Sequence, residues 1–572
     1  MPAADVDEAI RLEHLSFTYT GQSVPALRDV SLTVGRGEMI VVMGATGAGK
    51  TTLAKCLNRT IPAFQPGTLV GDIAILGRAL HAEGVADLAG IVGLVSQDFE
   101  AQLFATNVLQ EIAFGMEQLG VPPDEMRRRA PHALETVGLV GFEQRDPSTL
   151  SGGEKQRLAI AATLALQPRV LVFDEPTTDL DPLGKLEIFS VLATMRHQGY
   201  TLVVIEHEIA AADKADRLVI LSDGRIVADD TPARVLAQVD FLDAHGVRPP
   251  DFSRIAARLH FDALPRSLDD AEAAAREYLD PAMRASLAPA ESPLVTHHSS
   301  LPLVQADDVE FQYDSGTLAL RGVSLHIAAG EFVALIGQNG SGKTTLAKHL
   351  NGLLRPSRGR VRLDGTDVST LPLNRVASDV GYVFQNPDHQ IFAATVYDEV
   401  AFGPRNFGHS STDTAERVRA ALDAVGLVGL EREDPFLLSK GHRQRLAVAS
   451  LLALRPRLLI LDEPTTGLDY REQRRMMDLL ATLHAQGMAI LMITHSPWVV
   501  AEYAARGVLM RGGHALFDGP LRALFAEEAL LASAHFCAPD VTRLGRRLGF
   551  TPLSVDEFVD TLSPPRRDRG GS

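Results

Sequence analysis

The sequence predicts an α/β fold in which one large domain occurs twice, each copy followed by a small, mainly helical appendage. The duplication is visible as blocks that recur at an offset of 288 residues, among them residues 150–151 at 438–439 and residues 173–178 at 461–466. Within each copy, short and nearly continuous apolar runs alternate with amphipathic stretches. Such runs are typical of parallel strands that helices bury on both faces, so each large domain is predicted to be a layered α/β domain.

The expected elements follow one another in chain order. Residues 39–43 form a buried strand, and a glycine-rich loop separates it from a helix that includes residues 52–57. A helix over residues 154–166 precedes two further buried strands, residues 170–173 and 202–205. The second half repeats this order, with its corresponding first strand at residues 332–336.

Four domains are expected along the 572 residues: residues 1–235 and 301–525 as the large domains, 236–300 as the first appendage with its linker, and 526–572 as the second appendage. The appendages are predicted because residues 250–255 resemble residues 539–544 at an offset of 289. The alternative is that these segments are two unrelated polar tails. The proline-containing stretch 287–302 is predicted to be the linker between the halves.

The composition excludes several classes of protein. The net charge of −17 disfavours nucleic acid as the main partner, because the phosphate backbone is held by basic side chains. Two distant cysteines, Cys56 and Cys537, exclude a disulfide scaffold, a cysteine zinc site and an iron–sulfur cluster. The sequence has neither an apolar run long enough to span a bilayer nor an N-terminal signal core, so composition alone predicts a soluble protein of the cytoplasm.

Two glycine-rich loops carry the first chemical signal. Residues 44–51 and 337–344 both fit the pattern GxxxxGK[ST], and each lies between an expected strand and an expected helix. Glycines let consecutive backbone N–H groups curl around phosphates at the positive end of a helix, while the lysine neutralises phosphate charge. Both halves are therefore predicted to bind a nucleotide through residues Gly44, Gly47, Gly49, Lys50, Thr51, Thr52, Gly337, Gly340, Gly342, Lys343, Thr344 and Thr345.

Acidic pairs that end two of the expected strands provide the metal and the catalytic candidates. Asp174 and Asp462 each follow four apolar residues, as the carboxylate that organises Mg²⁺ in such a nucleotidase does, with Thr51 and Thr344 as direct ligands. Glu175 and Glu463 come next and are placed to polarise the attacking water. The alternative role for these carboxylates is to cap the following helix.

The segment Leu-Ser-Gly-Gly-Glu-Lys-Gln-Arg at residues 150–157 is the most specific motif. Together with the two loops, the Asp-Glu-Pro-Thr-Thr strings and His207, it resembles the ATP-binding cassette (ABC) ATPases, over nearly the whole chain and twice. The resemblance implies ATP and Mg²⁺ as cofactors, ATP hydrolysis, and a pseudo-dimer within one chain whose two ATP sites are shared between the cassettes.

The resemblance also implies roles for further residues. Tyr19 and Tyr313 would stack on adenine, His207 and His495 would hold the γ-phosphate, and Gln97 and Gln385 would sense Mg²⁺ and relay its presence to a partner. Asp181 and Asp469 would lie in loops that cross the dimer interface. The signature residues that would press on the γ-phosphate of the opposite cassette are Ser151, Gly152, Gly153, Ser439 and Gly441.

The second signature departs from the family pattern at Lys440, where the family has its first glycine. Because the sites are shared in the family, this lysine would affect the site of Lys50, whereas the site of Lys343 would keep an intact signature. Our hypothesis is that the Lys343 site turns over faster. The alternative is that Lys440 is tolerated or itself contacts the phosphate.

Residues 385–404 narrow the kind of ABC protein. This stretch resembles the energy-coupling factor (ECF) branch and its cobalt and nickel relatives, in which it forms a groove for a helix of a separate transmembrane subunit. Apolar Ile391, Phe392 and Phe402 beside acidic Asp388, Asp398 and Glu399 would suit an amphipathic, basic helix, and the first half keeps the same frame.

The resemblance therefore implies the ATPase of an ECF-type importer for a vitamin, a vitamin precursor, or cobalt or nickel ions. It would lie at the cytoplasmic face of the membrane, with a transmembrane coupling subunit and a membrane solute-binding subunit as partners and no direct contact with the solute. The alternatives are the ATPase of another ABC importer or exporter, or a twin-cassette ATPase that acts on ribosomes.

Overall fold

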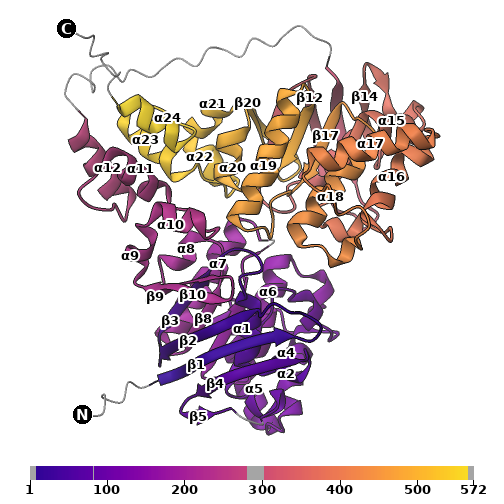
Figure 1. Cartoon of the computed structure of the whole chain (residues 1–572). Helices are drawn as coiled ribbons and strands as arrows, with labels where there is room; N and C mark the ends of the chain where they lie inside the picture. The colour runs from indigo at the N-terminus through magenta and orange to yellow at the C-terminus, as the bar shows by residue number, and fades with distance from the viewer. Residues whose placement is uncertain (1–7, 81–82, 179, 280–301, 564–572) are drawn as a thin grey trace. The chain divides into compact units, whose positions relative to one another are not determined.

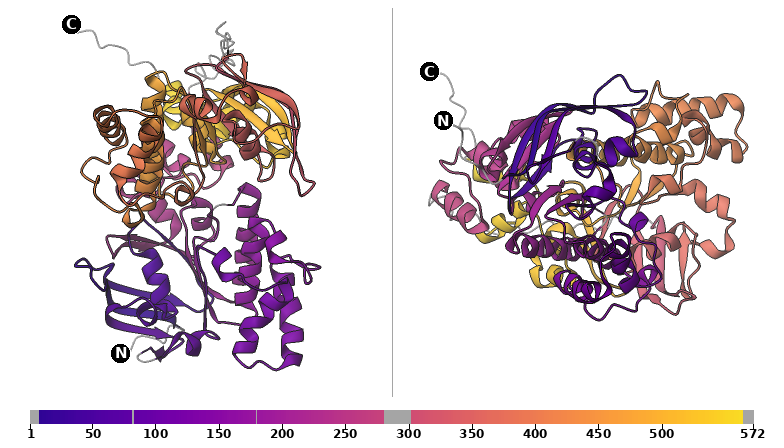
Figure 2. Two further views of the ribbon diagram at one scale, coloured as in Figure 1. Left: turned by 90° about the vertical axis from the view of Figure 1, so that its right-hand side faces the viewer. Right: turned by 90° about the horizontal axis from the view of Figure 1, so that it is seen from below.

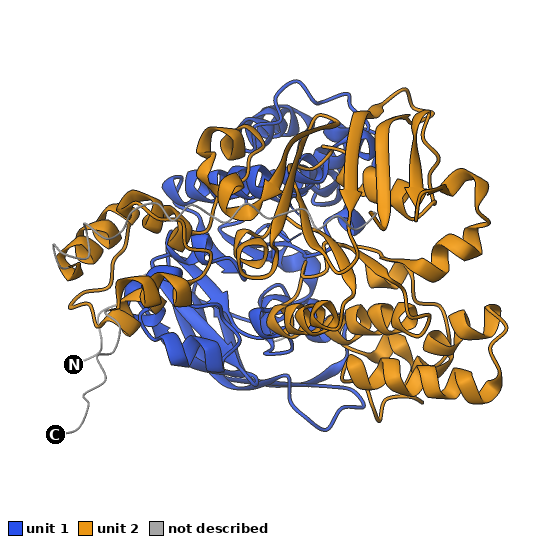
Figure 3. Ribbon diagram, turned by 90° about the horizontal axis from the view of Figure 1, so that it is seen from above, with its two compact units in different colours: residues 1–253, 469–471 blue, residues 254–468, 472–572 orange. Residues whose placement is uncertain are grey.

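The computed structural model describes residues 8–80, 83–178, 180–279 and 302–563 (Figure 1). The chain divides into two compact units, unit 1 with residues 1–253 and 469–471, and unit 2 with residues 254–468 and 472–572 (Figure 3). The predicted linker at 287–302 lies outside the described residues except for Pro302, and the four domain boundaries stay a prediction.

Unit 1 is built on a six-stranded sheet. Its strands lie in the order β10 (Arg225–Asp230), β9 (Arg217–Ser222), β3 (Met39–Met43), β8 (Thr201–Ile205), β7 (Val170–Asp174) and β6 (Val92–Val95). Neighbouring strands are parallel except at β10, which pairs antiparallel with β9. All residues of β3, β7 and β8 are buried, as the continuous apolar runs predict.

Side chains of β3 alternate between two hydrophobic clusters on the opposite faces of this sheet. Ile40 and Val42 pack in the cluster that includes helix α1 (Lys50–Leu57), whereas Met39, Val41 and Met43 pack in the other. The second cluster includes side chains of α4 (Val108–Gln118), α5 (Pro123–Thr136), α6 (Gly152–Leu164) and α7 (Pro182–His197). Helices thus cover both faces, which confirms the α/β fold class.

Two further layers complete unit 1. An antiparallel sheet has the order β2 (Leu27–Gly35), β1 (Glu8–Tyr19), β4 (Gly67–Ile75) and β5 (Arg78–Ala79), and its apolar face joins the cluster around α1. On the other side of the unit, α4 and α5 pack against α6, and the left view of Figure 2 shows this helical group standing beside the strands. Short helices α2 (Thr60–Ala63), α3 (Val85–Leu88), α8 (Ile209–Ala212), α9 (Pro232–Leu236) and α10 (Val239–Ala244) connect these layers.

Unit 2 repeats this architecture. Its large sheet has the order β20 (His514–Pro520), β19 (Arg506–Arg511), β13 (Phe332–Ile336), β18 (Ala489–Ile493), β17 (Leu458–Asp462) and β16 (Val380–Val383). Its antiparallel sheet has the order β12 (Leu318–Ile327), β11 (Val304–Gln312), β14 (Arg358–Leu363) and β15 (Thr366–Asp367). The helices that correspond to those of unit 1 are α14 (Lys343–Leu350), α16 (Val396–Asn406), α17 (Ser411–Ala424), α18 (Lys440–Leu452) and α19 (Tyr470–Ala485), and α15 (Leu373–Asp379), α20 (Pro497–Tyr503), α21 (Leu521–Ala526) and α22 (Glu528–Ser533) complete the set.

The appendage helices of both halves pack together within unit 2. Helix α12 (Leu268–Tyr278), from the first half of the sequence, contacts α23 (Asp540–Leu548), which α24 (Val555–Leu562) also contacts. Arg547 pairs with Asp269 and, at 3.1 Å, with Glu272. A further pair joins Arg258 of α11 (Asp251–Leu259) to Asp556 of α24. Among the described helices, none is long and apolar enough to cross a membrane.

Candidate functional site

The glycine-rich loop of the first half joins β3 to α1, and its lysine folds back over it. Lys50 is 5 % exposed, and its Nζ donates to the carbonyl oxygens of Gly44 at 2.8 Å and Ala45 at 2.9 Å. Burial lowers the pKa of this amine, while nearby carboxylates oppose the shift. Lys343 makes the same two bonds in the second half, to Gly337 at 2.7 Å and Gln338 at 2.9 Å. In both loops the ammonium group is therefore held at the mouth of the phosphate cradle.

The glycines of the loop are required by its backbone. Gly44 and Gly337 have φ of 146° and 144°, and a Cβ there would overlap the carbonyl oxygens of Leu221 and Met510. Gly47 and Gly340 also have positive φ, 80° and 73°, but a Cβ would meet nothing within 4 Å. Gly49 and Gly342, with φ of 102° and 101°, immediately precede the first helical residue. The glycines thus keep Cβ atoms away from the loop backbone, as a phosphate site needs, and in the first loop Thr46 N donates to Asp469 Oδ2 at 2.6 Å.

A threonine hydroxyl and an aspartate carboxylate meet in both halves at the carboxyl edge of the large sheet. Thr51 Oγ1 donates to Asp174 at 3.2 Å, and Thr344 Oγ1 donates to Asp462 at 2.7 Å. Burial raises the pKa of Asp174 to about 6, with the adjacent Glu175 adding to the shift, and burial also raises the pKa of Asp462. Hard oxygen donors beside a phosphate loop fit Mg²⁺, which completes its shell with water and substrate phosphates.

Glu175 lies at the centre of a hydrogen-bonded cluster in the first half. Its carboxylate accepts from Gln97 Nε2 at 2.7 Å and Thr178 Oγ1 at 3.1 Å, and lies 3.0 Å from His207 Nε2. Burial alone would raise the pKa of Glu175. The hydrogen bond and charge of His207, together with the charge of Lys50 and the hydrogen bond from Thr178, outweigh burial and hold this pKa at about 2. An ionised glutamate at this point can accept a hydrogen bond from a water molecule and polarise it.

The corresponding cluster of the second half is less complete. His495 Nδ1 lies 2.7 Å from Glu463, and Thr466 Oγ1 donates to the same carboxylate at 3.5 Å. Gln385 is exposed, and its side chain makes no hydrogen bond within the described part of the chain. The structure therefore brings Gln97, Glu175 and His207 together, but in the second half it joins only Glu463 and His495.

The two tyrosines expected at the adenine lie beside the loop helices. The Tyr19 hydroxyl lies 3.0 Å from the Thr52 hydroxyl, and the Tyr313 hydroxyl lies 3.0 Å from the Thr345 hydroxyl. Each ring also makes an edge contact with a phenylalanine two residues earlier. These contacts fix the rings near the phosphate loop, and stacking on adenine stays a prediction.

A comparison with protein families decides which family the chain belongs to. The family model for the ABC transporter matches residues 27–178 and 320–466, which include both glycine-rich loops and both Asp-Glu pairs. The chain belongs to the ABC transporter family. The two matched ranges also show that its ATP-binding cassette is duplicated.

Relatives of similar length match nearly the whole chain. A protein of Caldanaerobacter subterraneus, provisionally named an ABC transporter ATP-binding protein, is 46% identical over 97% of this chain and 98% of its own length. Proteins with the same provisional name from Methanosarcina acetivorans and Vibrio vulnificus are 40% and 34% identical, over 96% and 98% of this chain and 92% and 98% of their own lengths. A solved structure, CbiO1 of Clostridium perfringens, described as part of the ABC transporter complex cbiONQ, aligns at 33% identity with 41% of this chain and 94% of its own, with a TM-score of 0.38.

The ABC signature begins a helix in each cassette, but the two helices begin differently. Ser151 caps α6 in a reciprocal box: its Oγ accepts from Glu154 N at 3.3 Å, and Glu154 accepts from Ser151 N at 2.7 Å. Ser439 caps α18 and accepts from His442 N at 3.3 Å, but His442 replaces the glutamate and the return bond is lost. Gly152 and Gly153 form the first turn of α6, and Lys440 and Gly441 occupy these positions in α18.

The Lys440 side chain lies within its own cassette. Its Nζ occupies the space next to Gly467 where a Cβ would be placed, and Gly467 has a positive φ of 68°. The residue that corresponds to Gly467 in the first cassette is Asp179, which lies outside the described residues. Of the two interface-loop candidates, Asp181 caps α7 by accepting from Gly184 N at 2.9 Å, and Asp469 is 3% exposed.

Three residues that differ between the cassettes were not singled out from the sequence. Glu206 is buried beside His207 and accepts from Thr177 Oγ1 at 2.7 Å and His207 N at 2.8 Å, whereas the second cassette carries Thr494 there. Tyr382 stands where the first cassette has Leu94, and His442 where it has Glu154. Superposing the two halves at their offset of 288 residues would have revealed all three.

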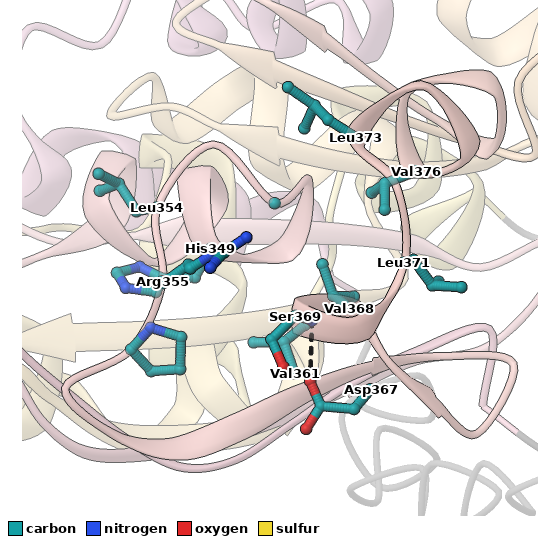
Figure 4. A pocket seen from close by; sticks show the side chains of 12 residues that line it. His349, Leu354, Arg355, Val361, Asp367, Val368, Ser369, Leu371, Leu373 and Val376 are labelled. Carbon is teal, nitrogen blue, oxygen red and sulfur yellow. Dashed lines mark hydrogen bonds between the residues drawn. The ribbon is translucent and has the colours of Figure 1, made fainter.

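A separate cavity lies in unit 2 between α14, β14 and α15. Its lining includes His349, Arg355, Asp367 and Leu373, which are drawn in Figure 4. None of the predicted ATP-site residues lines this cavity. The cavity is therefore distinct from the phosphate loop, although His349 lies on α14, the helix that follows this loop.

Proposed function

We propose that this ABC ATPase energises an ECF-type importer for a vitamin, a vitamin precursor, or cobalt or nickel ions. The chain is an ATP hydrolase coupled to transport, as its family is, and its cassettes bind ATP. Within the proposal, the partners are a transmembrane coupling subunit and a membrane solute-binding subunit, and the chain works at the cytoplasmic face of the membrane without touching the solute.

Five pairs of equivalent residues carry the chemistry of the proposal. Lys50 and Lys343 bind phosphate oxygens in exchange for the carbonyls that they contact in the free loop. Mg²⁺, held by Thr51 with Asp174 and by Thr344 with Asp462, would neutralise phosphate charge. Glu175 and Glu463 orient and deprotonate the attacking water, and His207 and His495 donate to the γ-phosphate. As in related cassettes, we propose that each site is completed by the signature of the other cassette.

The observation that carries the coupling part of the proposal is a pair of exposed aromatic rings repeated in both cassettes. Phe104 and Phe114 are 63% and 42% exposed, and their ring centroids lie 4.6 Å apart, edge to face. Phe392 and Phe402 repeat this arrangement at 60% and 47% exposure and 4.7 Å. Large apolar groups that remain exposed in the same place twice favour a partner that covers them.

Each aromatic pair is held in place by a buried glutamate. Glu111 is 4% exposed and accepts from the backbone N–H groups of Phe104 at 2.9 Å and Ala105 at 2.7 Å. Glu399 is 3% exposed and accepts in the same way from Phe392 at 3.0 Å and Ala393 at 2.8 Å. Such carboxylates fix the loop that presents the first ring of each pair.

This geometry corrects the expected charge of the groove. Glu399 was expected to face a basic partner helix, but it is buried and used within the cassette. Asp388 is paired with Arg443 at 2.7 Å and Asp398 with Arg405 at 3.0 Å, so both carboxylates already have cationic partners. Ile391 is buried as well. The proposed contact is therefore mainly apolar, through the two aromatic pairs.

Purification from membranes tests the proposal. The tagged chain is expected to bring down one small transmembrane coupling subunit and a solute-binding membrane protein. Phe392→Ala/Phe402→Ala and Phe104→Ala/Phe114→Ala should each lose most of this material while the purified chain still hydrolyses ATP. Phe64→Ala, which removes a ring that is 74% exposed elsewhere in the first cassette, is the control and should keep the complex. Recovery of a core of two permease subunits, or of ribosomes, would favour the alternative assignments instead.

A further inference from the structure

Tyr382 gives the second cassette a contact to its metal carboxylate that the first cassette does not have. The Tyr382 hydroxyl donates to Asp462 Oδ2 at 2.9 Å, and the same oxygen accepts from Thr344 at 2.7 Å. In the first cassette, Leu94 occupies the matching position, with no hydroxyl, and Asp174 accepts from Thr51 at the longer distance of 3.2 Å.

The tyrosine is placed by the sheet itself. Tyr382 lies on β16 opposite Ile460 of β17, two residues before Asp462, and Leu94 lies on β6 opposite Val172 in the same register. Tyr382 is 6% exposed, and its ring packs in the hydrophobic cluster beneath the loop helix of unit 2. A buried ring with a single hydrogen-bond partner has little freedom, so its hydroxyl holds the Asp462 carboxylate in one orientation.

We propose that Tyr382 is a positioning residue that orients Asp462 for Mg²⁺, so that the second cassette takes up the metal–nucleotide complex at a lower Mg²⁺ concentration than the first. When Thr344 turns its oxygen to the ion, Asp462 keeps the bond from Tyr382, whereas Asp174 has no such second donor among the described residues. Hydrogen-bond partners of a metal-ligating side chain typically change the metal affinity by about tenfold or more.

The inference rests on ATP binding by the cassettes and does not depend on the transport partner. The proposed role of Tyr382 concerns the site of the second cassette. In our hypothesis, this site also receives the intact signature of Ser151. Two independent differences between the halves, Tyr382 against Leu94 and Lys440 against Gly152, thus favour the same site.

Mn²⁺ binding by electron paramagnetic resonance tests the proposal on the whole chain. Mn²⁺ replaces Mg²⁺, a non-hydrolysable ATP analogue is present, and Lys50→Ala removes the contribution of the first cassette. In this background, Tyr382→Phe is expected to weaken Mn²⁺ binding roughly tenfold. Tyr503→Phe is the matched control, because it removes a hydroxyl that donates to another aspartate, Asp478, also at 2.9 Å. Equal Mn²⁺ affinities of the two variants would overturn the proposal.

Steady-state ATPase measurements over a range of Mg²⁺ concentrations provide a second readout. A merely structural role would not change the Mg²⁺ requirement separately from the rate at saturating Mg²⁺. Tyr382→Phe should raise the Mg²⁺ concentration for half-maximal rate while the rate at saturating Mg²⁺ stays close to that of the parent. The converse substitution, Leu94→Tyr, should tighten Mn²⁺ binding when Lys343→Ala silences the second cassette. A loss of rate that saturating Mg²⁺ does not restore would contradict a positioning role. These values do not depend on the membrane partners. The transport proposal can therefore fail without affecting this one, and the two are tested separately.

Discussion

Arg258 in the first half of the chain forms an ion pair with Asp556 in the second half. Their counterparts in the other copy of the appendage, Arg547 and Asp269, form the same pair in the opposite direction. The contact is thus reciprocal, as at an interface between two identical subunits, although both partners belong to one polypeptide. Within one polypeptide, the two appendages therefore meet through two equivalent ion pairs.

Charge reversal tests this contact. Arg258→Glu places two negative charges opposite each other and should speed hydrogen exchange in α11 and α24, while Arg258→Glu/Asp556→Arg should restore it. Because exposed ion pairs contribute little, each single reversal should change the exchange rate by no more than about fivefold. The matched variants of the second ion pair are Arg547→Glu and the double reversal Arg547→Glu/Asp269→Arg. A double reversal that exchanges as fast as the single one would contradict direct pairing.

The two ATP sites are expected to contribute unequally to turnover. Loss of the catalytic base typically costs a site about a hundredfold or more in rate, so Glu463→Gln should abolish most of the total ATPase activity. Glu175→Gln should leave more than about half of it, because Lys440 already slows that site in our hypothesis. Steady-state phosphate release measures both. Equal losses would contradict the asymmetry.

Restoring the second signature offers a complementary test. Lys440→Gly/His442→Glu recreates the residues that Gly152 and Glu154 supply in the first cassette. In a Glu463→Gln background, this double variant should raise the remaining ATPase rate if the lysine hinders the site. An unchanged or lower rate would support the alternative in which Lys440 is tolerated or contacts the phosphate.

Within the phosphate loop, two glycines should respond very differently to alanine. Gly44→Ala would drive a methyl group into the carbonyl oxygen of Leu221, so it should displace the loop and abolish nucleotide binding. In Gly47→Ala the methyl group meets no protein atom within 4 Å, so the fold of the loop has only the strain of a positive φ to bear, about 1–2 kcal/mol of unfolding free energy. Urea unfolding and the affinity for an ATP analogue measure the two effects. The pair Gly337→Ala and Gly340→Ala repeats the comparison in unit 2, and equal effects within a pair would contradict this explanation.

Glu206→Gln should stabilise the chain more at alkaline than at acidic pH. Burial raises the pKa of Glu206 above its usual 4.5, and the charge of Glu208 adds to the shift. The folded state therefore favours the protonated form, and the stability that this proton provides is lost as the pH rises from 4.5 through the raised value. Glutamine does not titrate and can keep the bonds to Thr177 and His207.

The measurement is the melting temperature of Glu206→Gln minus that of the parent, followed from about pH 5 to about pH 8. The difference should grow with pH. Glu117→Gln, which replaces an exposed glutamate of α4, is the control and should give a difference that does not change with pH. A difference for Glu206→Gln that is equally flat would contradict the raised pKa.

The parallel strands could be predicted from the sequence almost to the residue. The runs at 39–43 and 332–336 coincide with β3 and β13, because a strand buried on both faces is apolar throughout. The helix expected over 154–166 spans Gly152–Leu164 instead. The helix begins two residues earlier than expected because Ser151 caps it. It ends at Leu164, and beyond this end Gln167, which precedes Pro168, has a positive φ.

Side-chain partners that come from distant segments could not be predicted in this way. The motif order predicted that Glu175 and His207 belong to one site, but only the fold reveals that Gln97 reaches the same carboxylate. The expectation for Glu399 is wrong because the sequence does not reveal the two backbone N–H groups from which this carboxylate accepts hydrogen bonds. Burial and pairing depend on contacts across the chain, which a local pattern does not contain.

The packing of α12 against α23 has a consequence for how this protein could be divided. A single nick in the backbone after Leu279 and before Leu303 would leave α12 on the first fragment and α23 on the second. The two fragments would then each carry one complete cassette and one half of the contact between α12 and α23, here called the helical clasp. Fragments made as separate polypeptides should therefore associate through this clasp, which makes the fused chain and a pair of single-cassette proteins two forms of one assembly.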